Sequence, residues 1–254
     1  MKLNILKLAL GTALLAGASP AFAALIYQTG TQQTGTGLGA VSTLVTVQNN
    51  GPRNTIESGC VSFTGGDPAS PAQTCVSSTG LEGGDNTGGN AGNSTYLLSN
   101  IAGLANAGQL GFVVNISEPG NDPGATLTDL YMSLYSLNGT LLKTFSYTGA
   151  DLLLSGSGGT GQSGQHRFVL DAAQAAEALA ACGNLAQCVV GGGMQFGANS
   201  TQGTPEKLYV GAFARPTENP SQPGGTVPEP GSIALLGLGA AMFGAMRRRQ
   251  ATTK

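Results

Sequence analysis

Runs of alternating apolar and polar residues, separated by Gly, Pro and Asn, occupy the middle of the chain. The runs cover residues 41–47, 110–116, 130–147, 167–170 and 208–214. A period of two is typical of strands that bury one face. Asn138-Gly139 divides the longest run, and this pair accepts the positive φ angles of a type I′ turn. We therefore expect a hairpin with a two-residue loop there.

One segment has the pattern of a helix. Asp171 and Gln174 have the spacing of a capping box, and Gly183 follows as a C′ residue. Between them runs an apolar stripe made of Ala172, Ala175, Ala176 and Leu179. A second short helix or turn is expected over 100–107. Many strands with one or two short helices predict a mainly β body over 24–215, an antiparallel, jelly-roll-like β-sandwich.

The N-terminus has the layout of a secretory signal peptide. Lys2 and Lys7 precede an apolar run over 8–18, and the small residues Ala21 and Ala23 follow around Phe22. Signal peptidase accepts this A-x-A pattern, so we expect residues 1–23 to be removed by cleavage between Ala23 and Ala24. The alternative is a buried helix or a retained anchor, but the apolar run is too short to span a bilayer.

The C-terminus has three parts. A Pro/Gly linker over 216–226 leads to Pro228-Glu229-Pro230, an uncharged run of 14 residues follows over 233–246, and Arg247, Arg248 and Arg249 end the run. The apolar side chains of the predicted membrane segment include Ile233, Leu235, Leu236, Leu238, Met242, Phe243 and Met246. A helix of this length rises about 21 Å, against roughly 30 Å for a bilayer core. The arginines are expected to stay cytoplasmic.

This end resembles the PEP-CTERM sorting signal of Gram-negative bacteria, over residues 227–254. The resemblance implies recognition by exosortase, a membrane cysteine transpeptidase that removes the tail near Pro228-Glu229-Pro230. It also implies a bacterium that secretes polysaccharide. The protein would cross the inner membrane, remain anchored transiently, and then reach the cell surface or extracellular matrix. The module is also labelled "ice-binding protein C-terminal domain", a label from which we expect no ice binding. The alternative is an ordinary C-terminal anchor.

Composition and charge exclude further classes of binding partner. Only 9% of the residues are charged, against roughly 25% in an average soluble domain, and one His and no Trp are present. If Glu229 is retained after cleavage, removal of both ends leaves five basic residues against 13 acidic ones, a net charge of −8. Such a body is repelled by nucleic acid and by anionic lipid, so we expect no nucleic-acid partner and membrane contact only through the terminal helix.

Four cysteines in an exported chain predict disulfides. Three pairings are possible, and the local pairs Cys60–Cys75 and Cys182–Cys188 are favoured. Closing the first loop would stabilise the fold by about 3 kcal/mol in the chain-entropy model. Zinc ligands or a thiol nucleophile are the alternatives, but the sequence has no C-x-x-C motif.

Two features resemble catalytic or cofactor motifs only in part. His166 is the only candidate for a Ser-His-acid triad, and no G-x-S-x-G elbow is present, so we expect a polar loop His at a strand entrance. Residues 156–161 fit G-x-G-x-x-G, but a strand pattern follows in place of the helix that a dinucleotide site requires. We expect a hairpin loop there and no organic cofactor.

Acidic turns and tyrosines remain as candidate binding groups. Asp85, and Glu118 with Asp122, could offer oxygen ligands to Ca²⁺, although solvated turn acids are the favoured interpretation. Tyr131 and Tyr135 alternate on one face of an expected strand, and Tyr147 follows across the hairpin. Stacked sugar rings would suit such a surface, but core packing is the favoured use of these side chains.

These observations favour a non-enzymatic surface or matrix protein that signal peptidase and exosortase process and that associates with exopolysaccharide in a biofilm. A saccharide-binding adhesin is the alternative. A polysaccharide hydrolase is a third hypothesis, and it would need a carboxylate pair such as Asp129 and Asp151.

Overall fold

The computed structural model describes residues 24–29, 42–48, 56–68, 86, 93–117, 124–155, 164–197 and 205–213. They belong to a compact unit that spans Ala23–Arg215. The predicted signal peptide, linker and sorting signal lie outside the described residues. The described part is mainly β, with antiparallel strand pairing throughout and one α-helix.

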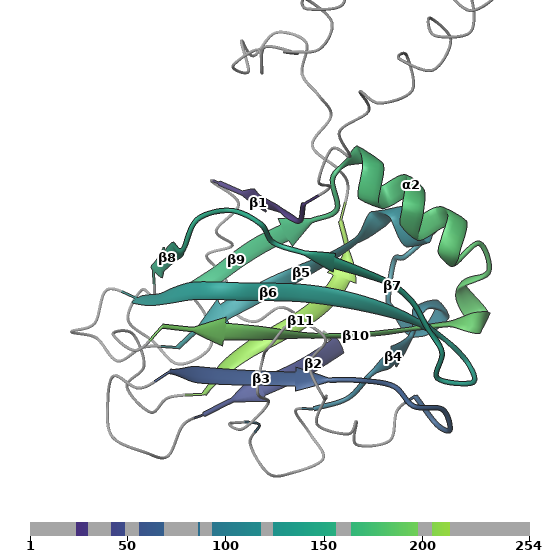
Figure 1. Cartoon of the computed structure of the whole chain (residues 1–254), viewed down its shortest axis with the longest axis horizontal. Helices are drawn as coiled ribbons and strands as arrows, with labels where there is room; N and C mark the ends of the chain where they lie inside the picture. The colour runs from purple at the N-terminus through teal and green to yellow at the C-terminus, as the bar shows by residue number, and fades with distance from the viewer. Residues whose placement is uncertain are drawn as a thin grey trace, which may run out of the picture. The chain divides into compact units, whose positions relative to one another are not determined.

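The elements follow one another along the chain as labelled in Figure 1. The strands are β1 (Ile26–Gln28), β2 (Ser42–Val47), β3 (Glu57–Val61), β4 (Tyr96–Leu97), β5 (Leu110–Ile116), β6 (Gly124–Ser136), β7 (Leu141–Ser146), β8 (Leu152–Ser155), β9 (Gly164–Val169), β10 (Cys188–Phe196) and β11 (Glu206–Ala212). The helices are α2 (Ala172–Ala181) and the 3-10 turns η1 (Leu98–Asn100), η2 (Ala107–Gln109) and η3 (Leu185–Gln187).

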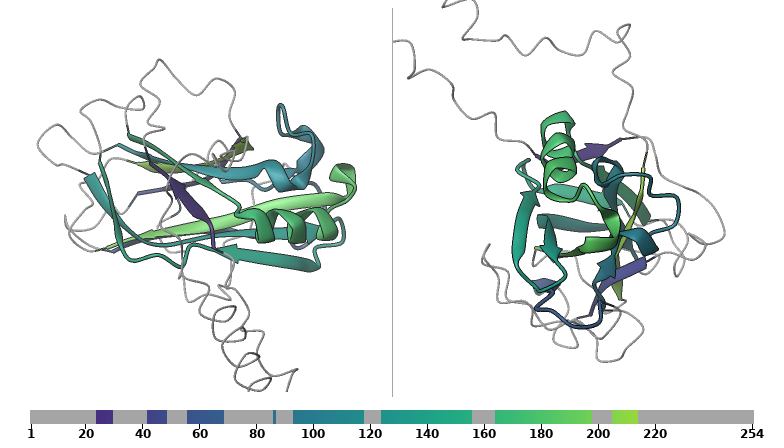
Figure 2. Two further views of the ribbon diagram at one scale, coloured as in Figure 1. Left: turned by 90° about the horizontal axis from the view of Figure 1, so that it is seen from above. Right: turned by 90° about the vertical axis from the view of Figure 1, so that its right-hand side faces the viewer.

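The strands form two antiparallel sheets. The first sheet has five strands in the order β1-β9-β5-β11-β2. The second has six, with the order β3-β10-β6-β7, while β4 pairs with β10 and β8 pairs with β6. Figure 2 shows the strands from two further directions, with α2 beside β7. Most connections cross from one sheet to the other. The crossing connections are β2–β3, β4–β5, β5–β6, β8–β9, β9–β10 and β10–β11.

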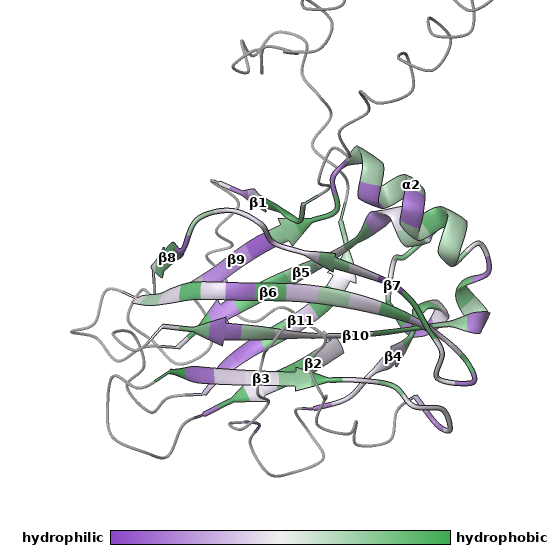
Figure 3. Cartoon of the chain, viewed as in Figure 1, coloured by the Kyte–Doolittle hydropathy of each residue, from purple (hydrophilic) through white to green (hydrophobic). Residues whose placement is uncertain are grey.

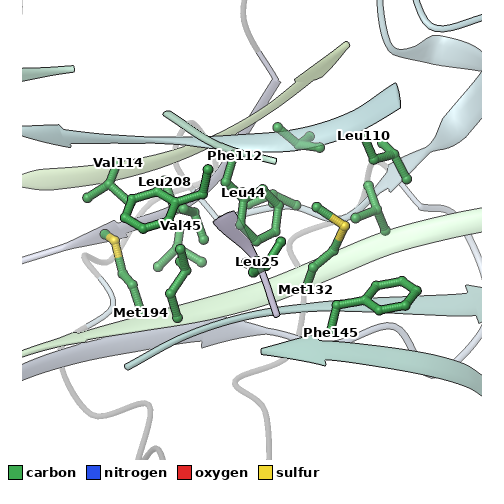
Figure 4. Packing of buried hydrophobic residues seen from close by; sticks show 14 of the residues in the cluster. Leu25, Leu44, Val45, Leu110, Phe112, Val114, Met132, Phe145, Met194 and Leu208 are labelled. Atoms are coloured by element: carbon green, nitrogen blue, oxygen red, sulfur yellow. The ribbon is translucent and has the colours of Figure 1, made fainter. Parts of the chain in front are cut away.

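Both sheets contribute side chains to one hydrophobic core. Phe112 and Leu208 of the first sheet and Met132 and Met194 of the second are fully buried members of a single cluster. Figure 4 shows these side chains between the strands. Burial of one such side chain contributes about 1.5–3 kcal/mol, so the inward-facing residues hold the two sheets together.

One of the two inner strands of the second sheet is a strand that the sequence did not predict. β10 contains Gly191, Gly192 and Gly193, and glycine weakens a strand pattern. The structure gives the reason for these glycines. A Cβ on Gly192 would lie 2.5 Å from the Tyr131 carbonyl oxygen and 2.9 Å from Phe112 Cζ. The core is packed so closely against this strand that only glycine fits.

The predicted hairpin is present, but the predicted turn is wrong. The Gly139 N–H bonds the Ser136 carbonyl at 2.9 Å, and the Ser136 N–H bonds the Thr140 carbonyl at 2.9 Å. The loop therefore has three residues, and Gly139 takes a φ of 84°. A register shift beside Tyr135 then restores the pairing that a two-residue loop would have given, with Leu134 opposite Lys143. The prediction failed because a bulge can compensate for one extra loop residue.

Helix α2 begins where the sequence predicted. The Asp171 carboxylate accepts a hydrogen bond from the Gln174 backbone N–H, at 2.7 Å from Oδ1. The predicted apolar stripe is wrong in part, because the buried side chains are those of Gln174, Ala175 and Ala178. Leu179 is 39% exposed. The helix ends at Ala181, immediately before the disulfide residue Cys182.

Candidate functional site

The side of the first sheet that faces away from the main core carries a row of polar side chains. Register places Gln165 opposite Asn115 and Asn115 opposite Lys207, while Arg167 lies opposite Val113 and Val113 opposite Tyr209. Gln28 of β1 lies opposite Arg167. We call this set the polar face: Gln28, Asn115, Gln165, Arg167, Lys207 and Tyr209. Figure 3 shows the hydrophilic stretches of β9 and β11 that contribute to it.

The arginine of the polar face is held in place by an aromatic ring. Arg167 Cζ lies 4.6 Å from the centroid of the Phe213 ring, within the range of a cation–π interaction. Burial lowers the pKa of Arg167, and its Nε is buried without a hydrogen-bond partner. A guanidinium pKa starts so high that the group stays protonated, so this position offers a fixed positive charge and a free donor.

Two amide side chains of the polar face have unused acceptors. Asn115 is 3% exposed and Gln165 is 4% exposed, and the side-chain oxygen of each has no hydrogen-bond partner among the described residues. The Asn115 side chain hydrogen-bonds the Tyr209 hydroxyl. Burial raises the pKa of Tyr209, and the bond from Asn115 acts in the opposite direction. Buried polar atoms are normally paired, so two amide oxygens on neighbouring strands without a partner among the described residues are an exception to this rule.

Charge distinguishes this face from the rest of the body. Arg167 and Lys207 are two of the five basic residues outside the predicted signal peptide and sorting signal. The described outward positions of β9, β5 and β11 include no carboxylate. The sequence contained the alternation of these strands, but it could not show that β9, β5 and β11 are neighbours, so the face was not predicted.

His166 is not the polar loop residue that the sequence suggested. It lies within β9, is 3% exposed, and connects both sheets. Its Nε2 lies 2.9 Å from the Ser155 carbonyl and its Nδ1 lies 2.8 Å from the Tyr27 hydroxyl. Burial lowers the pKa of His166, while the bond to Ser155 raises it. Both ring nitrogens are engaged in structural hydrogen bonds, so neither is available as a general base.

The three tyrosines do not form an exposed platform. Tyr131 and Tyr135 share the outward side of the second sheet, but they are only 3% and 8% exposed. Tyr131 Cε1 lies 2.8 Å from a Cβ built on Gly193, so its ring fills the space that glycine leaves. Tyr147 packs edge-on to Phe168 with 5.6 Å between centroids, against the main core. The favoured interpretation of these residues as packing groups agrees with this burial.

The two carboxylates proposed for a hydrolase lie in different surroundings. Asp129 lies in β6, and burial raises its pKa while a hydrogen bond from the Leu130 backbone lowers it. Asp151 is exposed and directly precedes β8.

One predicted disulfide is present, between Cys182 and Cys188, with an S–S distance of 2.06 Å. Cys60 is disulfide-bonded as well, and its predicted partner Cys75 lies outside the described residues. Glu57 and Glu206, which sequence reasoning did not single out, are 1% and 0% exposed.

Several candidates fall outside the described ranges. These are Asp85, Glu118, Asp122, the glycine-rich segment 156–161, the cleavage residues around Ala23, and the whole of 227–254. Within the described ranges, no three His, Cys, Asp or Glu residues come together in a way that could hold a metal ion. No helix in that same part of the chain is both long and apolar enough to cross a bilayer.

Comparison with known proteins concerns the C-terminus alone. The family model of the PEP-CTERM protein-sorting motif matches residues 226–250. No curated protein and no solved structure matches the chain. The matched segment includes Pro228-Glu229-Pro230, the apolar run and the three arginines, in the order that exosortase substrates have them. The chain therefore has a PEP-CTERM protein-sorting motif at its C-terminus and is an exported, exosortase-sorted protein.

Proposed function

We propose that the protein is a non-enzymatic component of the cell surface or extracellular matrix that associates with secreted polysaccharide. The match of residues 226–250 to the sorting motif is the observation on which this proposal depends. Signal peptidase would release the N-terminus at Ala24, and exosortase would remove the C-terminal tail. The Cys182–Cys188 disulfide supports this route, because such bonds persist in oxidising compartments outside the cytoplasm.

The body is well suited to a passive role at the surface. We infer a jelly-roll-like sandwich, because the orders β9-β5-β11-β2 and β3-β10-β6-β7 are those of chains that cross repeatedly between two facing sheets. The shared core supports the same inference. The two structural hydrogen bonds of His166 support a role without catalysis.

Replacement of Pro228-Glu229-Pro230 by three alanines tests the sorting. We expect the variant to keep its tail and accumulate at the inner membrane. The parent protein, in contrast, should lose its tail there and leave the membrane. Replacement of Pro220-Ser221-Gln222 in the linker by alanines is the matched control, and we expect it to be processed normally. Mass spectrometry of the C-terminus and fractionation of membrane, matrix and medium are the measurements. Equal processing of both variants would refute exosortase recognition at this motif.

A second candidate function is that of a saccharide-binding adhesin, and the polar face favours it. The two basic side chains of the polar face, Arg167 and Lys207, are half-buried and suit the carboxylates of an acidic sugar. A body with a net charge of −8 would repel such a polymer everywhere except at a face without carboxylates. Asn115 and Gln165 are buried, so the proposed contact is made by the basic side chains.

Binding to alginate, a linear polyuronate, tests this candidate, with neutral dextran as the comparison ligand. We expect Lys207→Gln to weaken alginate binding roughly tenfold, as expected for the loss of one charge-assisted contact of about 1.4 kcal/mol. Lys143→Gln removes an equal charge from β7, where Lys143 Nζ pairs with the Glu177 carboxylate at 2.9 Å, and should leave binding unchanged. Equal affinities for alginate and dextran, or equal loss in both variants, would argue against the polar face.

A further inference from the structure

The predicted first residue of the processed protein lies against a carboxylate. The Ala24 nitrogen is 2.9 Å from Asp171 Oδ2, and these residues are 147 positions apart in the sequence. In the unprocessed chain this nitrogen is an uncharged amide. Hydrolysis of the Ala23–Ala24 peptide bond consumes one water, and leaves a carboxylate on Ala23 and an ammonium group on Ala24.

We propose that Asp171 is a binding site for the α-ammonium group of Ala24, so that removal of the signal peptide creates an ion pair that ties the new N-terminus to helix α2. A neutral hydrogen bond becomes a charge-assisted one at an unchanged distance, and such bonds are roughly twice as strong. Capture of an N-terminal amine by groups of the fold is a recurring mode of recognition.

The backbone on the other side of Ala24 is already fixed. Leu25 is 1% exposed and belongs to the main core. Its N–H donates to the Ser146 carbonyl of β7 at 3.1 Å. Ala24 is therefore held within one residue of a buried anchor, and its ammonium group cannot move far from Asp171. A tethered, positioned charge loses little further entropy when it pairs.

Asp171 uses its two oxygens for different elements. Oδ1 accepts from the Gln174 N–H and caps α2, while Oδ2 accepts from Ala24. The positive end of the helix dipole lies beside this carboxylate, so α2 and the Ala24 ammonium group would both attract the same side chain. Maturation would thus strengthen the first turn of α2 and the docking of β1 through the same side chain.

Among the charged groups near Ala24, Asp171 is the one that contacts its nitrogen. The titratable residues described on the elements around Ala24 are Tyr27 on β1, His166 and Arg167 on β9, Lys143 on β7, and Asp171 and Glu177 at α2. Glu177 pairs with Lys143, and His166 bonds Tyr27 and Ser155. Asp171 is the group in this set that contacts the Ala24 nitrogen.

The test uses the exported, processed protein in three forms with intact disulfides. Besides the parent, one form has Gly-Ser inserted between Ala23 and Ala24, which keeps the cleavage pattern but returns Ala24 to a neutral amide. The other is Asp171→Asn, which keeps a good N-cap and removes the charge. N-terminal sequencing establishes the first residue of each form.

In the parent, the pairing raises the folded-state pKa of the α-ammonium above its ordinary value of about 7.7–8.0. The pair therefore stabilises the fold fully below that range and loses its effect as pH rises through the folded-state pKa. We expect the melting temperature of the parent to fall more between pH 7 and 10 than that of either variant. The parent amine should also react more slowly than the inserted form with an acylating reagent at pH 8.

The proposal would be overturned if the melting temperatures of the parent and the inserted form fell equally between pH 7 and 10 and their amines reacted at equal rates. The proposal rests on the proposed function only for cleavage after Ala23. A different first residue in the exported protein would refute the ion pair and leave exosortase sorting intact. Failure of the Pro228-Glu229-Pro230 test would refute sorting and leave the ion pair to be judged on the melting curves.

Discussion

The Tyr27 hydroxyl donates a hydrogen bond to His166 Nδ1 across 2.8 Å. The direction follows from the other side of the ring, because the Ser155 carbonyl bound to Nε2 can only accept. Nε2 therefore holds the proton, and Nδ1 is left with a lone pair. Strand β1, strand β9 and strand β8 meet at this one imidazole, which in its neutral form donates to Ser155 and accepts from Tyr27.

Acid should weaken the fold through His166. Burial lowers the folded-state pKa of this residue, so the unfolded chain binds the proton more readily. The contribution of the neutral ring to the free energy of unfolding is fully present above the unfolded-state pKa of about 6.5. It is lost as pH falls from that value through the lower folded-state pKa. We expect His166→Gln to flatten the dependence of the free energy of unfolding on pH between about 5 and 7. Urea unfolding of parent and variant across that range would show it, and identical slopes would contradict it.

Addition of one methyl group to β10 should destabilise the core. In Gly192→Ala, the new Cβ would meet the Tyr131 carbonyl oxygen at 2.5 Å, and this backbone atom cannot move without breaking the β6–β10 pairing. We expect a loss of about 2–3 kcal/mol, near the upper end of overpacking effects. Gly183→Ala is the control, because the nearest atom to its Cβ is 3.7 Å away. Chemical denaturation measures both, and a neutral Gly192→Ala would show that β10 is not tightly packed.

The hairpin glycine should be sensitive for two separate reasons. Gly139 has a φ of 84°, and a Cβ there would lie 2.2 Å from the Thr64 carbonyl carbon. Gly66 has a φ of 98° with nothing within 4 Å of its Cβ, so Gly66→Ala measures backbone strain alone. Each left-handed alanine costs about 1–2 kcal/mol, and we expect Gly139→Ala to cost clearly more than Gly66→Ala. Thermal unfolding of the two variants gives the comparison; equal losses would mean that the Thr64 contact relaxes freely.

Loss of the disulfide at the end of α2 should lower stability modestly. Cys182 and Cys188 are separated by six residues in sequence, so the closed loop is short. The chain-entropy model gives about 2 kcal/mol for such a loop. We expect the double variant Cys182→Ala with Cys188→Ala to lose about this amount in guanidinium unfolding. No change in the unfolding midpoint would show that the bond constrains little of the denatured chain.

The predictable parts of the fold depended on local signals. The runs over 41–47 and 110–116 became β2 and β5 nearly residue for residue, because their β-branched and aromatic residues are suited to strands in any context. The cap at Asp171 followed from its own side chain and the next three residues. These features need no knowledge of distant residues.

The features that sequence analysis missed depend on residues far apart in the chain. β10 was missed because the glycines that weaken it locally are required by Phe112 and Tyr131, which belong to other strands. His166 was placed in a loop because its partners, Tyr27 and Ser155, reach it only after the sheets have formed. The polar face exists only once β9, β5 and β11 lie side by side.

The sequence by itself determined the C-terminal sorting motif, since an enzyme reads that segment as a linear pattern of Pro-Glu-Pro, apolar helix and arginines. Tertiary structure alone decided that Ala24 meets Asp171, and that Asn115 and Gln165 share a surface with Arg167 and Lys207. The physical reason is that strand register and crossing connections, which depend on packing of the whole core, bring these groups together. Local patterning specifies elements, but only the completed core specifies which elements become neighbours.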